Sequence, residues 1–77
     1  MNLLIMTSDL VVFDGVVDKV TLPGSLGNFQ VLRNHAFMIT TLERGDLMYS
    51  INSIESIFAI NGGFMNVKDN KIVILTH

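Results

Sequence analysis

The sequence contains no cysteine, so disulfides are excluded as a source of stability. A chain of 77 residues buries only about 60 to 65% of its unfolded surface when it folds. Natural domains of this size usually add disulfides, a metal or a partner. The composition therefore leaves a metal or an interface as the additional source of stability.

Charge is also scarce, at 16% of residues against roughly 25% in an ordinary domain. Between Val20 and Leu42 the only formal charge is Arg33, and this stretch also holds the only proline, Pro23. So small a domain cannot bury all of such a segment, which favours contact with a partner. The net charge of −2 predicts no nucleic-acid binding, because that function depends on a cationic surface.

Long apolar runs are missing as well. Uninterrupted runs such as Leu3 to Met6 and Leu10 to Phe13 are far shorter than the roughly 20 residues that a bilayer requires. We therefore expect no direct membrane insertion. The N-terminus lacks a basic region followed by a long apolar core, so we expect no signal peptide.

Apolar residues recur with a period of two along most of the sequence, and no window shows the periodicity of a helix. The expected strands are 2–7, 10–13, 16–22, 27–32, 36–42, 46–51, 54–60, 64–68 and 71–76. The expected breaks between them include 14–15, 23–24, 43–45, 52–53 and 69–70, with 62–63 as a bulge or corner. The pattern predicts one all-β domain over 1–77, an antiparallel β-sandwich of about eight to ten short strands or a small barrel.

The polar face that a free antiparallel sheet shows to water is largely absent. Charges fall mostly at the expected turns, and Ile72 to Leu75 is apolar on both faces of its strand. An exposed apolar patch of roughly several hundred Å² would follow, and such patches mark interfaces.

The sequence offers little support for a catalytic function. His35 would need an orienting carboxylate and a nucleophile to act as a general base, and neither is near it in the sequence. His35 and His77 do not show the spacing of metal ligands. Gly24 and Gly27 are not followed by the Gly-Lys-Ser/Thr of a phosphate loop. We therefore expect no enzyme activity, no metal and no cofactor, and a structural or interface role for His35.

Two alternatives remain open at this point. Asp18-Lys19 in a small all-β domain resembles a lipoyl-type carrier domain, which would be modified on Lys19. The chain could also be a small oligonucleotide-binding β-barrel, although its few aromatic and basic residues suit that function poorly.

Six motifs, in order, resemble the N-terminal β-sandwich of the epsilon subunit of F-type ATP synthase. They are Phe13-Asp14-Gly15-Val16-Val17, Val20-Thr21-Leu22-Pro23-Gly24-Ser25-Leu26-Gly27, His35-Ala36, Leu42-Glu43-Arg44-Gly45, Ile60-Asn61-Gly62-Gly63-Phe64, and Val67 with the closing run from Asp69 to Leu75. The resemblance covers essentially the whole chain in one register.

The resemblance implies a non-catalytic rotor subunit on the cytoplasmic face of the bacterial inner membrane. It would dock the gamma subunit onto the polar loops of the c-ring and help couple rotation to ATP synthesis. By position, Asn28 would face the ring loops, and His35, Phe37 and Thr40 would face gamma. Longer members continue into two C-terminal helices that this sequence does not include, so we expect no ATP binding.

Overall fold

The computed structural model describes residues 1–32 and 36–77, and every regular element in these residues is a strand. The strands are β1 (Asn2–Met6), β2 (Val11–Val16), β3 (Lys19–Gly24), β4 (Gly27–Leu32), β5 (Met38–Ile51), β6 (Ile54–Lys68) and β7 (Lys71–Thr76). They form one seven-stranded sheet in the order β2-β1-β7-β6-β5-β3-β4. The predicted all-β class is confirmed.

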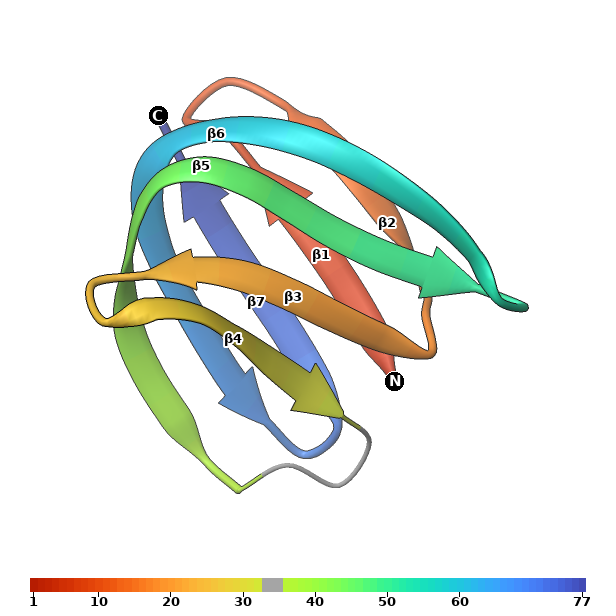
Figure 1. The fold of residues 1–77 in the computed structure, drawn as a ribbon. Coiled ribbons are helices and arrows are strands. Elements are labelled where there is room, and N and C mark those ends of the chain that lie inside the picture. Colours follow the sequence, from red (N-terminus) through yellow and green to blue (C-terminus); the bar gives the residue numbers. More distant parts are fainter. Residues whose placement is uncertain (33–35) are drawn as a thin grey trace.

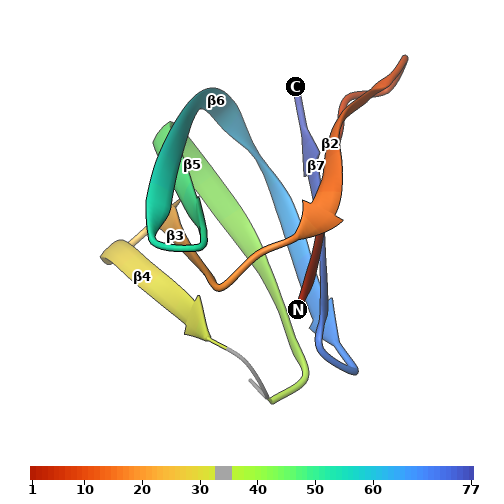
Figure 2. The same ribbon diagram turned by 90° about the vertical axis from the view of Figure 1, so that its right-hand side faces the viewer.

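Two long strands fold this single sheet into a sandwich (Figure 1). Within β6, only the last residues, Gly63 to Lys68, pair with β7, whereas β3 pairs with the last part of β5, Thr21 lying opposite Met48. The first layer therefore contains β2, β1, β7, the end of β6 and the start of β5. The second contains β4, β3, the end of β5 and the start of β6, and Figure 2 shows the two layers from the side.

The corner of β6 explains why the double glycine of this strand is needed. Gly62 and Gly63 have φ values of +93° and +149°, which residues other than glycine rarely adopt. A Cβ at Gly63 would also collide with the carbonyl oxygen of Leu75. The buried Thr76 hydroxyl donates a hydrogen bond of 2.8 Å to the Gly62 carbonyl and so holds β7 against the corner. Glycine is needed at 62–63 as the prediction of a bulge or corner implies, but β6 continues through these residues, so the expected strands 54–60 and 64–68 are one strand.

The two expected hairpin turns also form. Asn52 and Ser53 connect β5 to β6 with φ values of +51° and +67°, and Asp69 and Asn70 connect β6 to β7 with +52° and +63°. Positive φ at both central residues characterises the turn that matches the twist of antiparallel strands. These turns set the two registers that build the bent centre of the sheet.

Other expected breaks are wrong, and two of them, at 43–45 and 62–63, are why seven strands replace eight to ten, because β5 and β6 continue through them. The expected break at Pro23-Gly24 is also wrong, because both residues are paired inside β3 and the turn follows them. Asp14 and Gly15 lie inside β2, opposite Leu4 and Leu3, and not in a turn. A Cβ at Gly15 would lie 2.9 Å from Cζ of Phe13, so this glycine makes room for the Phe13 ring. Likewise, 43–45 lies inside β5, because the strand bends there without ending.

One strand pair differs from the antiparallel prediction. β1 runs parallel to β7, with Leu3 opposite Ile72 and Ile5 opposite Ile74, whereas every other pair is antiparallel. All four of these side chains are fully buried. Alternation decides which side chains point inward, but it leaves the partner of each strand open, so the parallel pairing of the two terminal strands had no sequence signal.

The core lies between the two layers. Its fully buried large side chains are Leu3, Ile5, Val20, Leu22, Val31, Leu47, Met65, Val67, Ile72 and Ile74. They come from β1, β3, β4, β5, β6 and β7, and the rings of Phe13 and Tyr49 meet beside them with centroids 4.4 Å apart. Since both layers contribute, neither layer has a complete core without the other.

Candidate partner-binding surfaces

A shallow groove of about 270 Å³ brings together two of the predicted contact residues, Asn28 and Thr40. Its lining residues share one property, which is that none of them is ionisable: Gly24, Ser25, Leu26, Gly27, Asn28, Phe29, Met38 and Thr40. Asn28 is exposed at the start of β4, and Thr40 is half-buried near the start of β5. The groove therefore lies between the β3–β4 hairpin and the start of β5.

The β3–β4 hairpin owes its shape to the glycine spacing. Gly24 pairs with Gly27 across a two-residue turn, Ser25 and Leu26, and Gly27 closes the turn with a φ of +110°. Pro23 is buried just before the turn. The Leu26 side chain is fully exposed, at 102% of its reference area. The turn thus presents an uncharged tip at one end of the sandwich.

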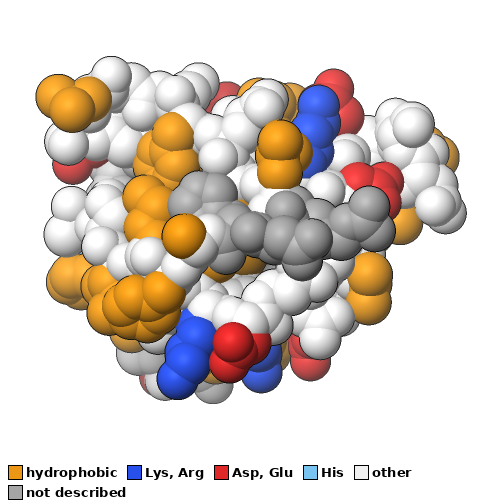
Figure 3. All heavy atoms as spheres, turned by 90° about the horizontal axis from the view of Figure 1, so that it is seen from below, with side chains coloured by type: hydrophobic (Ala, Val, Ile, Leu, Met, Phe, Trp, Pro, Cys, Tyr) orange, Lys and Arg blue, Asp and Glu red, His pale blue; other side chains and the backbone are white. Residues whose placement is uncertain are grey.

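Phe37 is not part of this groove. It lies just before β5 and is 64% exposed, which is unusual for an aromatic side chain. His35, the remaining predicted contact residue, lies outside the described residues. Figure 3 views this end of the molecule, where hydrophobic side chains gather along one side of the surface.

The outer surface of the first layer carries a continuous row of apolar side chains. Register pairs join the row step by step: Val11 opposite Met6, Met6 opposite Leu75, and Leu75 opposite Phe64. Directly paired residues point to the same face of a sheet, so these four form one surface, here called the outer apolar row. Phe64 remains 54% exposed and Leu75 44% exposed. This row confirms the expectation of an apolar surface patch.

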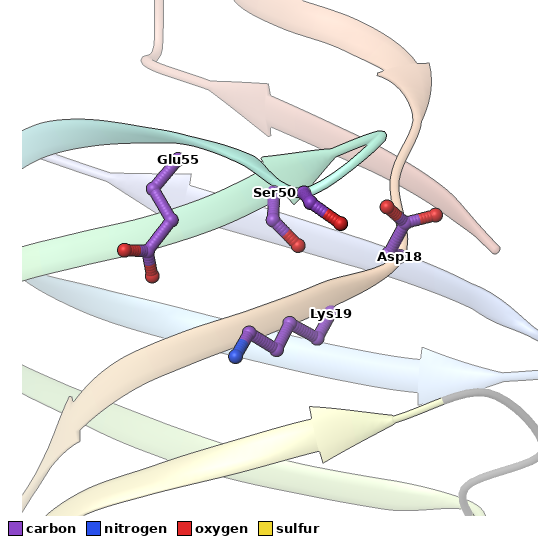
Figure 4. Close-up of a pocket in the computed structure, with 5 residues that line it drawn as sticks. Asp18, Lys19, Ser50 and Glu55 are labelled. Carbon is purple, nitrogen blue, oxygen red and sulfur yellow. The ribbon is translucent and has the colours of Figure 1, made fainter.

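Lys19 occupies a different setting, at the start of β3 and opposite both Leu32 and Ser50. With Asp18, Ser50, Ser53 and Glu55 it lines an open hollow of about 420 Å³ (Figure 4). A carrier lysine is expected at an exposed hairpin tip, but the tip of this hairpin is Ser25-Leu26, and Lys19 is half-buried inside the sheet. The geometry does not support the carrier alternative.

Residues 1–32 and 36–77 contain no cluster of three His, Cys, Asp or Glu side chains arranged to hold a metal ion. In the same residues no helix has the length and apolar character needed to cross a membrane.

Sequence reasoning did not single out three exposed apolar residues near these surfaces, Leu26, Phe64 and Leu75. Leu26 follows the Pro-Gly turn signal, where an apolar side chain is out of place, and this signal was available. Phe64 and Leu75 follow the alternation, but only the register shows that they lie side by side. The outer apolar row is thus a product of strand pairing.

Comparison with known proteins identifies the family. The family described as ATP synthase, Delta/Epsilon chain, beta-sandwich domain matches residues 1–77. A protein named ATP synthase epsilon chain from Trichlorobacter lovleyi is 40% identical over 75 residues, which are 97% of this chain and 54% of that protein. One from Carboxydothermus hydrogenoformans is 38% identical over 73 residues, or 95% and 54% of the two chains. This chain spans about half the length of the curated relatives it matches.

Solved structures agree in fold. A chain of the Euglena gracilis mitochondrial ATP synthase, in a structure of OSCP, F1 and c-ring, superimposes with a TM-score of 0.90 at 25% identity over 96% of this chain and 48% of that one. A chain of the Tetrahymena thermophila mitochondrial ATP synthase central stalk and c-ring gives a TM-score of 0.81 at 18% identity, over 97% and 61% of the two chains, and shares the fold. The match over all 77 residues shows that this chain belongs to the family of the ATP synthase delta/epsilon β-sandwich domain.

Proposed function

We propose that this chain is a non-catalytic central-stalk subunit of a bacterial F-type proton-translocating ATP synthase. Its 77 residues act as one domain that docks the gamma subunit onto the c-ring at the cytoplasmic face of the inner membrane, and it binds no ATP. The observation that carries the proposal is the family match over the whole chain, together with relatives that are named ATP synthase epsilon chain.

The mechanics of the sheet support a role in transmitting torque. β5 and β6 pair along nearly their whole length and run through both layers, from Met38 opposite Val67 to Ile51 opposite Ile54. Sliding one layer over the other would break the backbone hydrogen bonds of both strands. A body that resists such shear can pass rotation from the c-ring to gamma without absorbing it in its own deformation.

Exposed apolar area supports two docking surfaces. Gamma covers Phe37, together with Thr40 and His35 as the family resemblance implies, and extends over Ile39, which is 64% exposed and diagonal to Phe64 on the paired strand. Asn28 at the other side of the groove faces the c-ring loops. Covering these side chains supplies the burial that a chain of this size lacks alone.

Co-purification with tagged gamma tests this function. We expect Phe37→Ala to weaken the association about tenfold or more, because a large aromatic side chain loses its burial in the interface. Ile54→Ala is the matched control, since Ile54 is 73% exposed at the β5–β6 turn, away from the proposed surface. Failure of the wild-type chain to associate with gamma would refute the proposed function, and equal behaviour of the two variants would refute the position of the gamma surface.

A further inference from the structure

The β6–β7 hairpin places two exposed lysines directly opposite each other. Lys68 is the last residue of β6 and Lys71 is the first of β7, and the two form the register pair next to the turn. They share an open hollow of about 290 Å³, whose lining residues are Asn66, Lys68, Asp69, Lys71 and Val73. Like charges directly opposite each other destabilise an antiparallel pair, so this arrangement does not serve the isolated hairpin.

The lysine pair lies on the same face of the sheet as the outer apolar row. Lys71 precedes Leu75 by four residues in β7, and side chains return to one face of a strand at every second residue. Leu75 lies opposite Phe64, and Lys71 lies opposite Lys68, which is four residues further along β6. The lysines therefore form a charged end to the outer surface of the first layer, beside the β6–β7 turn (Figure 1).

The hollow is also continuous with the proposed gamma surface. Asn66, which lines the hollow, lies directly opposite Ile39. Phe37 precedes the first paired residue of β5, and Lys68 follows the residue that pairs with it. A partner that covers Ile39 and Phe37 therefore reaches the two lysines as well.

We propose that Lys68 and Lys71 together bind one carboxylate of the gamma subunit, an Asp or Glu side chain, at the rim of its docking surface. This contact rests on the proposed function and adds the charge that gamma presents there. The hollow holds two ammonium groups against the single carboxylate of Asp69, so it attracts an anion although the whole chain has a net charge of −2. A carboxylate between the two ammonium groups relieves their repulsion, and such rim charges favour fast and specific association.

A third lysine provides the matched control. Lys19 is half-buried in β3 of the second layer, where it lines a different hollow with Asp18 and Glu55. Lys19→Gln removes the same charge from the chain as either substitution in the β6–β7 hairpin would. It leaves the lysine pair and the outer surface of the first layer unchanged.

The test is equilibrium binding of the purified chain to gamma at low and high salt. The variants are Lys19→Gln and a double variant that carries Lys68→Gln and Lys71→Gln. At low salt we expect the double variant to bind about fivefold more weakly, as the loss of exposed ion pairs implies, and Lys19→Gln to bind as the wild type does. At high salt the difference should fall below about twofold, because exposed charges are screened. The free double variant should unfold thermally no earlier than the wild type, because the lysine pair is repulsive without a partner.

The outcomes separate the two proposals. Wild-type affinity in the double variant, or an equal loss in Lys19→Gln, would overturn the carboxylate site and leave the rotor function standing. Earlier thermal unfolding of the double variant would show that the lysines stabilise the free fold, and would also overturn the site. A wild-type chain that does not bind gamma would overturn both proposals. Binding of the wild-type chain to vesicles of phosphatidylethanolamine and phosphatidylglycerol that the double variant loses would assign the lysines to an anionic lipid surface and overturn the proposal.

Discussion

The outer surfaces of the two layers differ although both come from the same continuous sheet. On the first layer the outer apolar row runs across neighbouring strands from Val11 to Phe64. On the second layer a comparable row is half polar and half apolar: Gln30 lies opposite Thr21, Thr21 opposite Met48, and Met48 opposite Ile57. Beside it lie the charged and hydroxyl side chains of the Lys19 hollow.

This difference indicates that the layers meet different surroundings. A half-polar row is more easily tolerated in water than a wholly apolar row, which costs solubility unless a partner covers it. The proposed gamma contacts at Phe37 and Ile39 belong to the same side of the molecule as Phe64, because Ile39 pairs with Asn66 two residues along β6. Under the proposed function the first layer is therefore the docking layer, and the second contributes the hairpin that carries Leu26.

The most damaging change is expected at the corner that joins the layers. Gly63→Ala should lower the free energy of unfolding by about 4 kcal/mol or more, because its Cβ would collide with the Leu75 carbonyl and its φ of +149° suits glycine. Urea denaturation measures the loss. Gly27→Ala is the control: it also has positive φ but open space around it, so about 1 kcal/mol is expected. Equal losses would show that steric collision plays no part at the corner.

Substitutions at two neighbouring residues of β7 should distinguish the inner face of the first layer from its outer face. Ile74→Ala removes a fully buried side chain and should cost about 3 kcal/mol of unfolding free energy. Leu75→Ala should cost less than about 1 kcal/mol, since that side chain is already 44% exposed without a partner. Thermal and urea unfolding of both variants provide the comparison. Similar losses at the two positions would contradict the inward and outward assignment.

The smallest expected effect compares the two outer surfaces directly. Leu75→Lys places a charge in the outer apolar row and should weaken co-purification with gamma about tenfold, which corresponds to about 1.4 kcal/mol. Ile57→Lys places the same charge on the second layer, where Ile57 is 65% exposed, and should leave the association unchanged. If Ile57→Lys were the more damaging of the two, gamma would have to cover the second layer.

Much of the fold could be predicted, and the failures have physical causes. The hairpins at 52–53 and 69–70 were correct because short polar pairs tolerate positive φ. The break at Asp14-Gly15 was wrong because a glycine can also make room for a nearby ring, here that of Phe13. The local sequence does not distinguish a glycine in a turn from a glycine beneath a ring. Breaks at 43–45 failed because a bent strand and a turn share the same residues.

The predicted contact residues also show what the local sequence leaves open. Asn28 and Thr40 were predicted to face different partners, and the structure places both on one groove. They are 12 positions apart in the sequence and meet because the β3–β4 hairpin folds beside the start of β5. Their assignment to ring or gamma stays a prediction.

The sequence by itself determined the all-β class, the tight turns at 52–53 and 69–70 and the shortage of charge, because alternation and polar turn residues act over a few neighbouring positions. Only the tertiary structure decided that β1 lies parallel to β7, that one sheet bends into two layers, and that Leu75 lies beside Phe64. Strand pairing joins residues far apart in the chain, and the burial energy that selects one pairing over another belongs to the whole sandwich.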